Sequence, residues 1–176
     1  LKGYPFVIVS GLALGIDSIA HKTALEVGLP TIAIPGSGLD DKVLYPSANR
    51  GLADLILRKG GCILSEFEPD FRATLWSFPK RNRIVAGISR AVIVIEAPEK
   101  SGALITVRMA VDYNRDVFAV PGSIFSETSK GTNKFIKLGA TPLTCAEDIL
   151  NAFGLIDPLM PTQQTFAELE DISEDE

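Results

Sequence analysis

Short apolar runs rich in β-branched residues alternate along this chain with amphipathic stretches of helical length, and this alternation limits the fold most strongly. The runs predict buried strands at 6–10, 31–35, 62–66, 91–97 and 117–121. The stretches between them predict helices at 16–28, 47–59, 79–88 and 103–114, and a shorter unit at 135–138, 140–144 and 146–153 closes the pattern. Strands that alternate with helices indicate βαβ units, so we expect an α/β fold with a mostly parallel sheet and helices on both faces.

The apolar positions of these segments predict the core. We expect it to contain Leu25, Val27, Ile32, Ile34, Ile63, Val92, Val94, Val107 and Val111.

Charge is distributed unevenly along the 176 residues, whose formal net charge is −5. Residues 155–176 contain seven acids and no Lys or Arg, so we expect an acidic flexible linker or tail there. The remaining 1–154 carry 15 acids and 17 bases, and the chain's 46% hydrophobic composition suits a single domain over this range. From 72 to 108 there are seven bases and two acids, a concentration of positive charge that favours an anionic partner.

Several classes of protein are disfavoured by what the sequence contains. No apolar run approaches the roughly 20 residues of a membrane span, and no signal-peptide pattern opens the chain. The two cysteines, Cys62 and Cys145, and the single histidine lack metal-ligand spacing. We therefore expect a cytoplasmic protein without membrane contact, bound metal or cofactor.

The segment 78–87, Phe-Pro-Lys-Arg-Asn-Arg-Ile-Val-Ala-Gly, predicts a phosphate-binding helix start. Pro79 suits the first turn of a helix, whose free N–H groups and partial positive charge attract phosphate. Lys80, Arg81 and Arg83 strengthen that field, and Arg can bind phosphate oxygens in pairs. If this run is considered without the other motifs, the alternative to phosphate binding is a basic helix face that only contacts solvent.

Small residues follow four of the predicted strands, and they support the phosphate interpretation. In parallel sheets, ligands bind beyond the carboxyl ends of the strands. Those ends carry Gly, Ser and Thr at 10–17, 35–40, 97–106 and 120–123. The chain has neither the P-loop pattern nor the dinucleotide fingerprint, which disfavours a standard NTPase or dinucleotide enzyme.

Other polar and aromatic residues leave alternatives open. His21 follows Asp17 by one helical turn; a packing contact is favoured over catalysis with Ser10 or Ser18. Glu66 and Glu96 end strands and either act as acid or base, cap loops or pair with the nearby arginines. Trp76 and Phe78 lie among cations, where either core packing or base stacking on single-stranded nucleic acid would use them.

Taken together, the motifs resemble those of the DNA-processing protein A (DprA/Smf) family. They are 10–21, 36–40, Tyr45-Pro46 with Asn49, Ser65-Glu66, 78–87, Glu96-Ala97, 100–102, 120–122 and 131–133. The resemblance implies a Rossmann-like three-layer domain that binds single-stranded DNA without cutting it, protects incoming strands during natural transformation and helps to load the RecA recombinase. It implies a DNA site of Phe78, Lys80, Arg81, Asn82 and Arg83, lined by Gly11, Gly38, Ser101 and Gly102, with no catalytic residue. It also implies a homodimer through a region that contains Asn133, Ile136, Pro142 and Leu143.

The chain departs from the family pattern at both ends, and two other functions are alternatives. The family's earlier βα unit with its Gly-Ser-Arg loop, and the winged-helix domain that often follows, are not in this sequence. A nucleotide-processing phosphoribohydrolase with a similar fold is the first alternative, but the diglycine and catalytic Glu of that group are missing from 100–106. A small-molecule or nucleotide sensor that uses the same loops is the second.

Overall fold

A computed structural model describes residues 1–155. It divides into two compact units, of which the first is Leu1–Leu143 and the second begins at Thr144. The second unit contributes one described helix, α6 (Ala146–Ala152). The acidic segment predicted from residue 155 onward lies, apart from Leu155, outside the described residues, and that prediction stays open.

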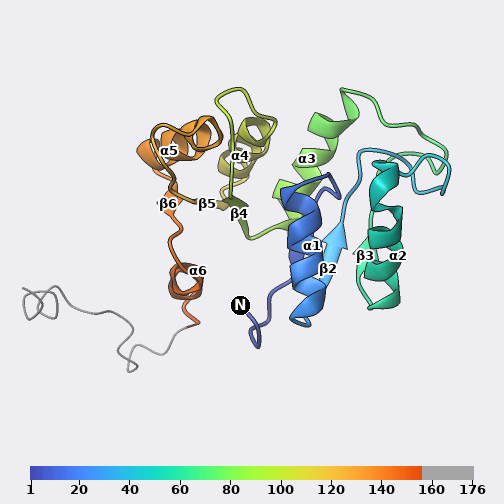
Figure 1. The fold of residues 1–176 in the computed structure, drawn as a ribbon, viewed down its shortest axis with the longest axis horizontal. Helices are drawn as coiled ribbons and strands as arrows, with labels where there is room; N and C mark the ends of the chain where they lie inside the picture. Colours follow the sequence, from blue (N-terminus) through green and yellow to red (C-terminus); the bar gives the residue numbers. More distant parts are fainter. Residues whose placement is uncertain (156–176) are drawn as a thin grey trace, which may run out of the picture. The chain divides into compact units, whose positions relative to one another are not determined.

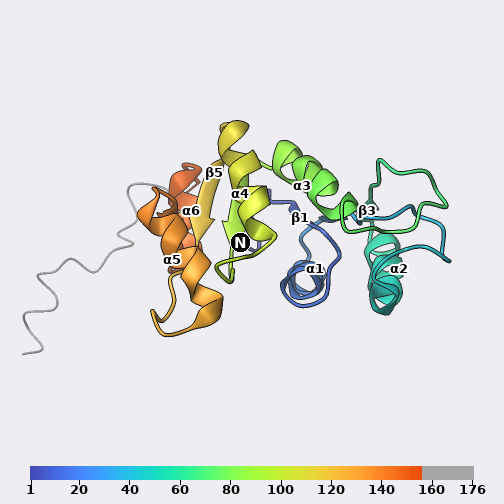
Figure 2. The same ribbon diagram turned by 90° about the horizontal axis from the view of Figure 1, so that it is seen from above.

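The first sheet of the larger unit contains three short parallel strands in the order β1-β2-β3. They are β1 (Ile8–Ser10), β2 (Thr31–Ala33) and β3 (Cys62–Ile63), joined by α1 (Ile16–Glu26) and by the 3₁₀ turn η1 (Ser47–Asn49) with α2 (Arg50–Arg58). In Figure 2, α1 and α2 lie on one side of this sheet and α3 (Ser77–Ile88) lies on the other. The two faces are thus covered as the alternating pattern predicts.

The second sheet is also parallel, in the order β4-β5-β6. Its strands are β4 (Ala91–Val94), β5 (Asp116–Ala119) and β6 (Thr141–Pro142), and its helices are α4 (Ala103–Asp112) and α5 (Lys130–Lys137), the latter after the 3₁₀ turn η2 (Glu127–Ser129). Helix α4 packs against β4 and β5, and α5 packs against β5 (Figure 1). The α/β class and the parallel pairing are confirmed, although the strands form two ladders because β1 and β4 do not pair with each other.

The strands are shorter than the sequence predicts, and side-chain contacts explain one case. Beyond β3, Leu64 N still donates to Ala33 O at 2.9 Å, but the Ser65 hydroxyl then donates to Ser37 O at 2.7 Å. A side chain therefore takes over from the backbone ladder at the point where the strand was expected to continue to 66.

Two apolar clusters form the core of the larger unit. The first contains Leu12, Ala33, Leu44, Leu52, Ala53 and Ile56, and the second contains Ala86, Val92, Val94, Ala97, Val107, Ala110, Ala119 and Phe135. Of the predicted core residues, Ile34, Val92, Val94 and Val107 are buried and Leu25, Val27, Ile32 and Ile63 are half-buried.

The prediction for Val111 is wrong, because its side chain is 64% exposed. The buried stripe of α4 steps from Val107 to Ala110, so the last turn of the helix leaves Val111 to solvent.

None of the helices in residues 1–155 combines the length and the hydrophobicity that crossing a bilayer requires.

Candidate functional site

Helix α3 begins at Ser77, two residues before the predicted start, because the Ser77 side chain anchors the first turn. Its hydroxyl is fully buried, donates to Gly36 O at 2.6 Å and accepts from Thr74 N at 3.0 Å. This contact fixes the start of α3 to the loop that follows β2. Farther along, Ala86 packs into the core cluster of the second sheet, so α3 joins the ends of one sheet to the interior of the other.

Arg81 is a buried cation at the end of the first sheet. Its side chain is 6% exposed, Nη1 donates to Ile34 O, and Nε donates to Asn82 Oδ1 at 3.1 Å. Burial lowers the pKa of Arg81, and the negative charge of Asp17 opposes that shift. A Cβ on Gly11 would lie 1.9 Å from Nη1, so only glycine lets this loop approach the guanidinium.

The loop between β1 and α1 is held rigidly against Arg81. Asp17 Oδ2 accepts from Gly11 N at 2.9 Å and from Ala13 N at 3.1 Å. Asn49 Nδ2 donates to Leu12 O at 2.8 Å and to Ala13 O at 3.1 Å. These contacts hold Leu12 at a φ of 61°, a conformation that costs energy for a residue other than glycine.

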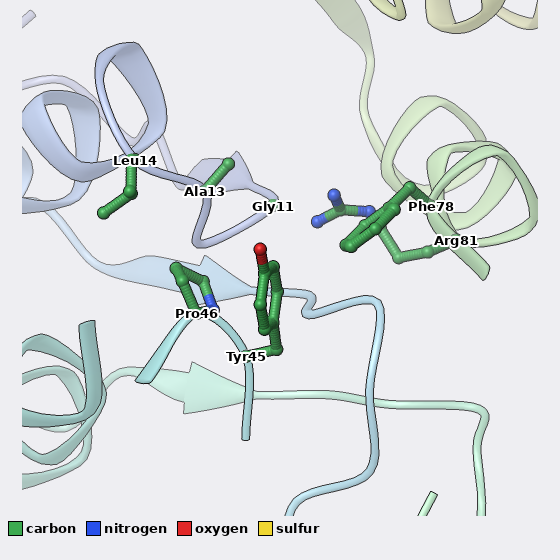
Figure 3. Close-up of a pocket in the computed structure, with 7 residues that line it drawn as sticks. All are labelled: Gly11, Ala13, Leu14, Tyr45, Pro46, Phe78 and Arg81. Carbon is green, nitrogen blue, oxygen red and sulfur yellow. The ribbon is translucent and has the colours of Figure 1, made fainter. Parts of the chain in front are cut away.

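A pocket of about 260 Å³ opens between this loop and α3 (Figure 3). It is lined by Gly11, Ala13, Leu14, Tyr45, Pro46, Phe78 and Arg81. The rings of Tyr45 and Phe78 lie 5.7 Å apart between centroids. The Phe78 ring lies so close to Gly36 that a Cβ there would come within 2.6 Å of it. The pocket therefore offers two aromatic rings and a guanidinium.

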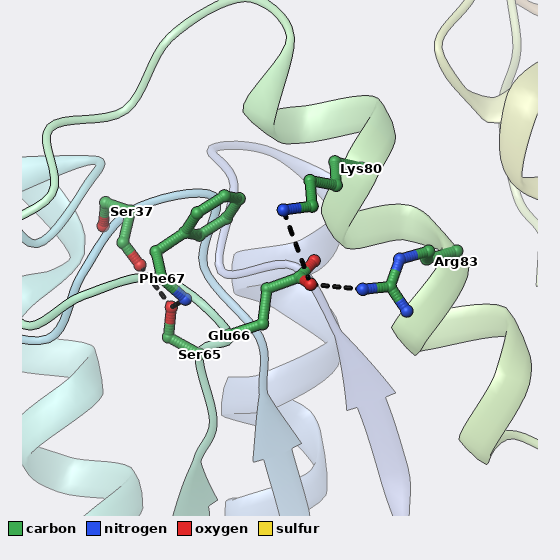
Figure 4. A network of polar contacts seen from close by, with 6 residues as sticks. All are labelled: Ser37, Ser65, Glu66, Phe67, Lys80 and Arg83. Atoms are coloured by element: carbon green, nitrogen blue, oxygen red, sulfur yellow. Dashed lines mark hydrogen bonds and ion pairs between the residues drawn. The ribbon is translucent and has the colours of Figure 1, made fainter.

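Lys80 and Arg83 lie on the exposed side of α3 and share one acidic partner, Glu66 (Figure 4). Lys80 Nζ lies 3.8 Å from Glu66 Oε2, and Arg83 Nη2 donates to the same oxygen. The side chains of Lys80 and Arg83 remain 48% and 46% exposed, so each can still reach a bound anion. Glu66 is thus an ion-pair partner, one of the three roles that the sequence left open for it.

An aromatic cluster of Phe67, Phe71 and Trp76 lies beside Lys80. The rings of Phe67 and Phe71 stack at 4.6 Å between centroids, and both meet Trp76 edge-on. No sequence motif singled out Phe67 and Phe71. Their spacing of four residues was the only available signal, and the segment that carries them is not helical.

The other predicted site residues lie outside the pocket lining. Gly38 is buried beneath backbone, where a Cβ would come within 2.2 Å of Glu68 O and Pro69 O. Ser101 accepts from Ala103 N at 3.2 Å at the start of α4, and the neighbouring Gly102 is exposed. The structure thus brings together Gly11, Phe78 and Arg81 in the pocket, and Lys80 and Arg83 beside it.

The residues assigned to dimerisation have different surroundings. Asn133 donates to Gly122 O at 2.9 Å and accepts from Gly122 N at 3.2 Å. Ile136 packs against the core cluster of the second sheet, Leu143 is half-buried beside β6, and Pro142 is exposed in β6 itself. Pro142 is therefore the most accessible member of the set.

His21 has a structural environment, in line with the interpretation that the sequence favoured. It is fully buried, and its Nδ1 lies 2.7 Å from Thr31 Oγ1, which itself donates to Ile8 O. Because that hydroxyl proton is used, Nδ1 carries the proton of the His21–Thr31 bond. Among residues 1–155, no group of three His, Cys, Asp or Glu side chains is placed to hold a metal ion.

The fold and this site define a Rossmann-like α/β domain with a basic, aromatic pocket at the carboxyl end of its first sheet. Residues 1–154 match the family model of the DNA recombination-mediator protein A, and the chain belongs to this family. The resemblance that the sequence motifs indicate is confirmed.

Curated relatives show the same membership. The chain is 49% identical over 147 residues to the DNA processing protein DprA of Streptococcus pneumoniae, covering 84% of this chain and 51% of that protein. It is 45% identical over 150 residues to the protein Smf of Escherichia coli, covering 84% and 40%. The chain thus spans about half the length of the curated relatives it matches, or less.

Solved structures agree with the fold. The DNA processing protein A of Streptococcus pneumoniae matches with a TM-score of 0.77 and 48% identity, covering 83% of this chain and 50% of that one. The DNA processing protein A of Helicobacter pylori matches with a TM-score of 0.74 and 36% identity, covering 84% and 65%, and is described as having a unique single-stranded DNA binding mode.

Proposed function

We propose that this chain binds single-stranded DNA at the start of α3, with one base in the Phe78 pocket and the adjoining phosphates on Lys80 and Arg83. The proposal rests on one observation: the aromatic pocket lies next to a helix turn that carries two exposed cations, Lys80 and Arg83. Bases stack on aromatic rings while cations follow the sugar–phosphate backbone, which is the chemistry that unpaired strands require. The single-stranded DNA binding described for the Helicobacter pylori relative supports it.

The geometry favours a strand over a small cofactor. A pocket of about 260 Å³ is smaller than the roughly 300–1,000 Å³ that drug-sized ligands occupy, so it suits a single ring. A ring can enter it only when it is free of a base pair. The cations outside the pocket then contact the sugar–phosphate backbone on either side of that base. A free nucleotide has no such continuing backbone and would leave these cations unused.

Family membership extends this proposal to the cellular role. We infer that the domain protects single strands in the cytoplasm during natural transformation, acts as a homodimer, and helps to load RecA onto those strands. We also propose that it performs no covalent chemistry on DNA, since Glu66 is paired with Lys80 and Arg83. Single strands incubated with magnesium or manganese should stay intact, and nucleoside monophosphates should release no free base. Strand cleavage that is lost in Glu66→Gln protein, or base release, would contradict the non-catalytic role.

The test of binding compares one labelled oligothymidylate with a matched duplex and with nucleoside monophosphates as competitors, by fluorescence anisotropy. We expect the single strand to bind more tightly than the duplex, and the mononucleotides to compete weakly. Equal affinity for duplex and single strand, or complete competition by a mononucleotide at equal concentration, would contradict the proposal.

A further inference from the structure

The aromatic cluster of Phe67, Phe71 and Trp76 lies outside the pocket, and neither the family match nor the pocket accounts for it. Phe67 and Phe71 are half-buried and support Trp76, whose ring meets theirs at 5.8 Å and 5.5 Å between centroids. Trp76 is nevertheless 55% exposed, and Leu75 before it is 91% exposed. The indole of Trp76 is therefore supported by other rings on one part and open to solvent on the rest. Such an indole offers a surface on which another flat group can stack.

The support of Trp76 is fixed by backbone hydrogen bonds. Gly38 N donates to Phe71 O at 2.8 Å and Asp40 N donates to Pro69 O at 2.9 Å. Phe67 N donates to the Ser65 hydroxyl at 3.1 Å. The segment that carries the two phenylalanines is thereby held against the loop after β2, so a ligand would meet an ordered surface and little ordering entropy would be lost.

The charge beside the cluster indicates which ligand fits. Lys80 Nζ lies 5.3 Å from the Phe67 ring centroid and 5.7 Å from that of Trp76. The ammonium group of Lys80 therefore already occupies the position over these rings where a cation would bind. A cationic ligand would be repelled, whereas a flat neutral ring attached to an anion would be attracted. A nucleobase with its phosphate has that chemistry.

The position of Trp76 relates it to the pocket. Trp76 immediately precedes α3 and Phe78 is the second residue of the helix, so their side chains leave the first turn about 200° apart in an ideal helix. Phe78 faces the pocket, and Trp76 lies on the side of Lys80 and Phe67. One strand that crosses the helix start would therefore meet an aromatic ring on each side, with Lys80 beside the Trp76 ring.

We propose that Trp76, supported by Phe67 and Phe71, is a second base-stacking position, which takes a neighbouring base of the strand whose other base enters the Phe78 pocket. The inference rests on the proposed function, because it needs a bound single strand. It assigns Trp76 to direct contact with the ligand rather than to covering the two phenylalanines.

Trp76 is the chain's one tryptophan, so its fluorescence reports this position alone. A base that stacks on the indole quenches its emission. We expect oligothymidylate to quench the fluorescence over the same concentration range in which anisotropy shows binding. An oligonucleotide of equal length and charge that lacks its bases should leave the emission nearly unchanged. Binding detected by anisotropy without quenching would overturn the inference.

Substitutions give an independent readout. Trp76→Ala should raise the Kd for oligothymidylate by about 5- to 150-fold, the cost of one base stack, while Trp76→Phe should retain most of the affinity. Leu75→Ala is the matched control, since Leu75 is adjacent and exposed and should leave the Kd unchanged. Circular dichroism melts establish that the variants fold.

Equal affinities of the Trp76→Ala and Leu75→Ala proteins would overturn the second stacking position. If Trp76→Ala fails to fold, the quenching of the wild-type protein still decides. Absence of any strand binding by the wild-type protein would instead contradict the proposed function itself, and with it this inference.

Discussion

The guanidinium of Arg81 lies where two loops and a helix meet. It donates to Ile34 O, contacts Gly11 and lines the pocket. Replacing it with alanine would leave a buried carbonyl without its donor, a loss of about 1–3 kcal/mol in the free energy of unfolding, in addition to any loss of binding. Arg83 is half-exposed and bonds only to a side chain in the described structure, so substitution there reports on binding with less disturbance of the fold.

In the proposed binding mode, Glu66 competes with phosphate for Lys80 and Arg83, and this gives a prediction. Glu66→Gln should tighten single-strand binding and steepen its salt dependence by about 0.7 in log–log slope for each additional phosphate that the freed cations bind. The fold should be retained, because exposed ion pairs contribute only about 0–1 kcal/mol. Glu127→Gln, which removes the partner of Lys130, makes the same charge change elsewhere and is the control.

Equal increases in affinity of the two variants would mean that net charge alone acts. Weaker binding by Glu66→Gln would mean that Glu66 positions the cations.

His21 gives a prediction for pH. Burial lowers the pKa of His21 below its ordinary value of 6.5, Arg81 adds to that shift and Asp17 opposes it. The unfolded chain therefore binds a proton at His21 before the folded protein does. Stability should be complete above pH 6.5 and fall as the pH drops below it, by at most about 1.4 kcal/mol per pH unit.

Urea unfolding between about pH 7.5 and about pH 5.5 measures this dependence, because that window lies above the ordinary pKa of the carboxyl groups. His21→Asn keeps a donor for Thr31 and removes the titration, so its stability should vary less with pH. An identical pH dependence in both proteins would show that another group is responsible.

At the scale of elements, the sequence predicts the order and type of the strands and helices from β1 to β5, because periodicity and β-branched composition are local properties. The family resemblance implies that Phe78, Arg81 and Gly11 belong to one site, and the small residues at the carboxyl ends of the strands support a site at that edge of the sheet. The sequence leaves open whether Glu66 pairs with Arg83, and it does not predict the contact of Phe67 with Trp76. Those contacts depend on the path of an irregular segment, which is set by hydrogen bonds distant in sequence, such as Gly38 N to Phe71 O.

Gly38 is an element-scale test of that path. Gly38→Ala would place a methyl group within 2.2 Å of two backbone oxygens, which cannot move aside as a flexible side chain can. We expect a loss of about 1–3 kcal/mol in the free energy of unfolding, together with weaker quenching of Trp76 by DNA. Gly51→Ala, in the exposed part of α2 with nothing within 4 Å, should instead stabilise by about 0.4–1 kcal/mol. Unfolding curves for Gly38→Ala that match those of the wild-type protein would contradict this close packing of Gly38 against backbone.

At the scale of the whole molecule, the proposed homodimer can be tested at β6, which pairs only with β5 among the described strands. Leu138 is 75% exposed and Pro142 is exposed, whereas Ile136 packs against the core. Leu138→Glu combined with Pro142→Lys should therefore give a folded monomer by light scattering. Val111→Glu, which places a charge on an exposed apolar site of α4, should remain dimeric. A dimer that survives the double substitution would place the interface elsewhere, and a monomeric wild-type protein would contradict the proposal of dimerisation.

We propose that the exposed cations of α3 contact the phosphates of a single strand. The most direct measurement is the salt dependence of oligothymidylate binding by the wild-type protein, by Arg83→Ala and by Arg58→Ala, which removes an exposed arginine at the end of α2. Each phosphate that is no longer neutralised lowers the log–log slope by about 0.7, so Arg83→Ala should bind more weakly with a slope shallower by about that amount. The Arg58→Ala protein should match the wild-type protein. Unchanged affinity and slope in Arg83→Ala protein would contradict the claim and place the strand on another surface.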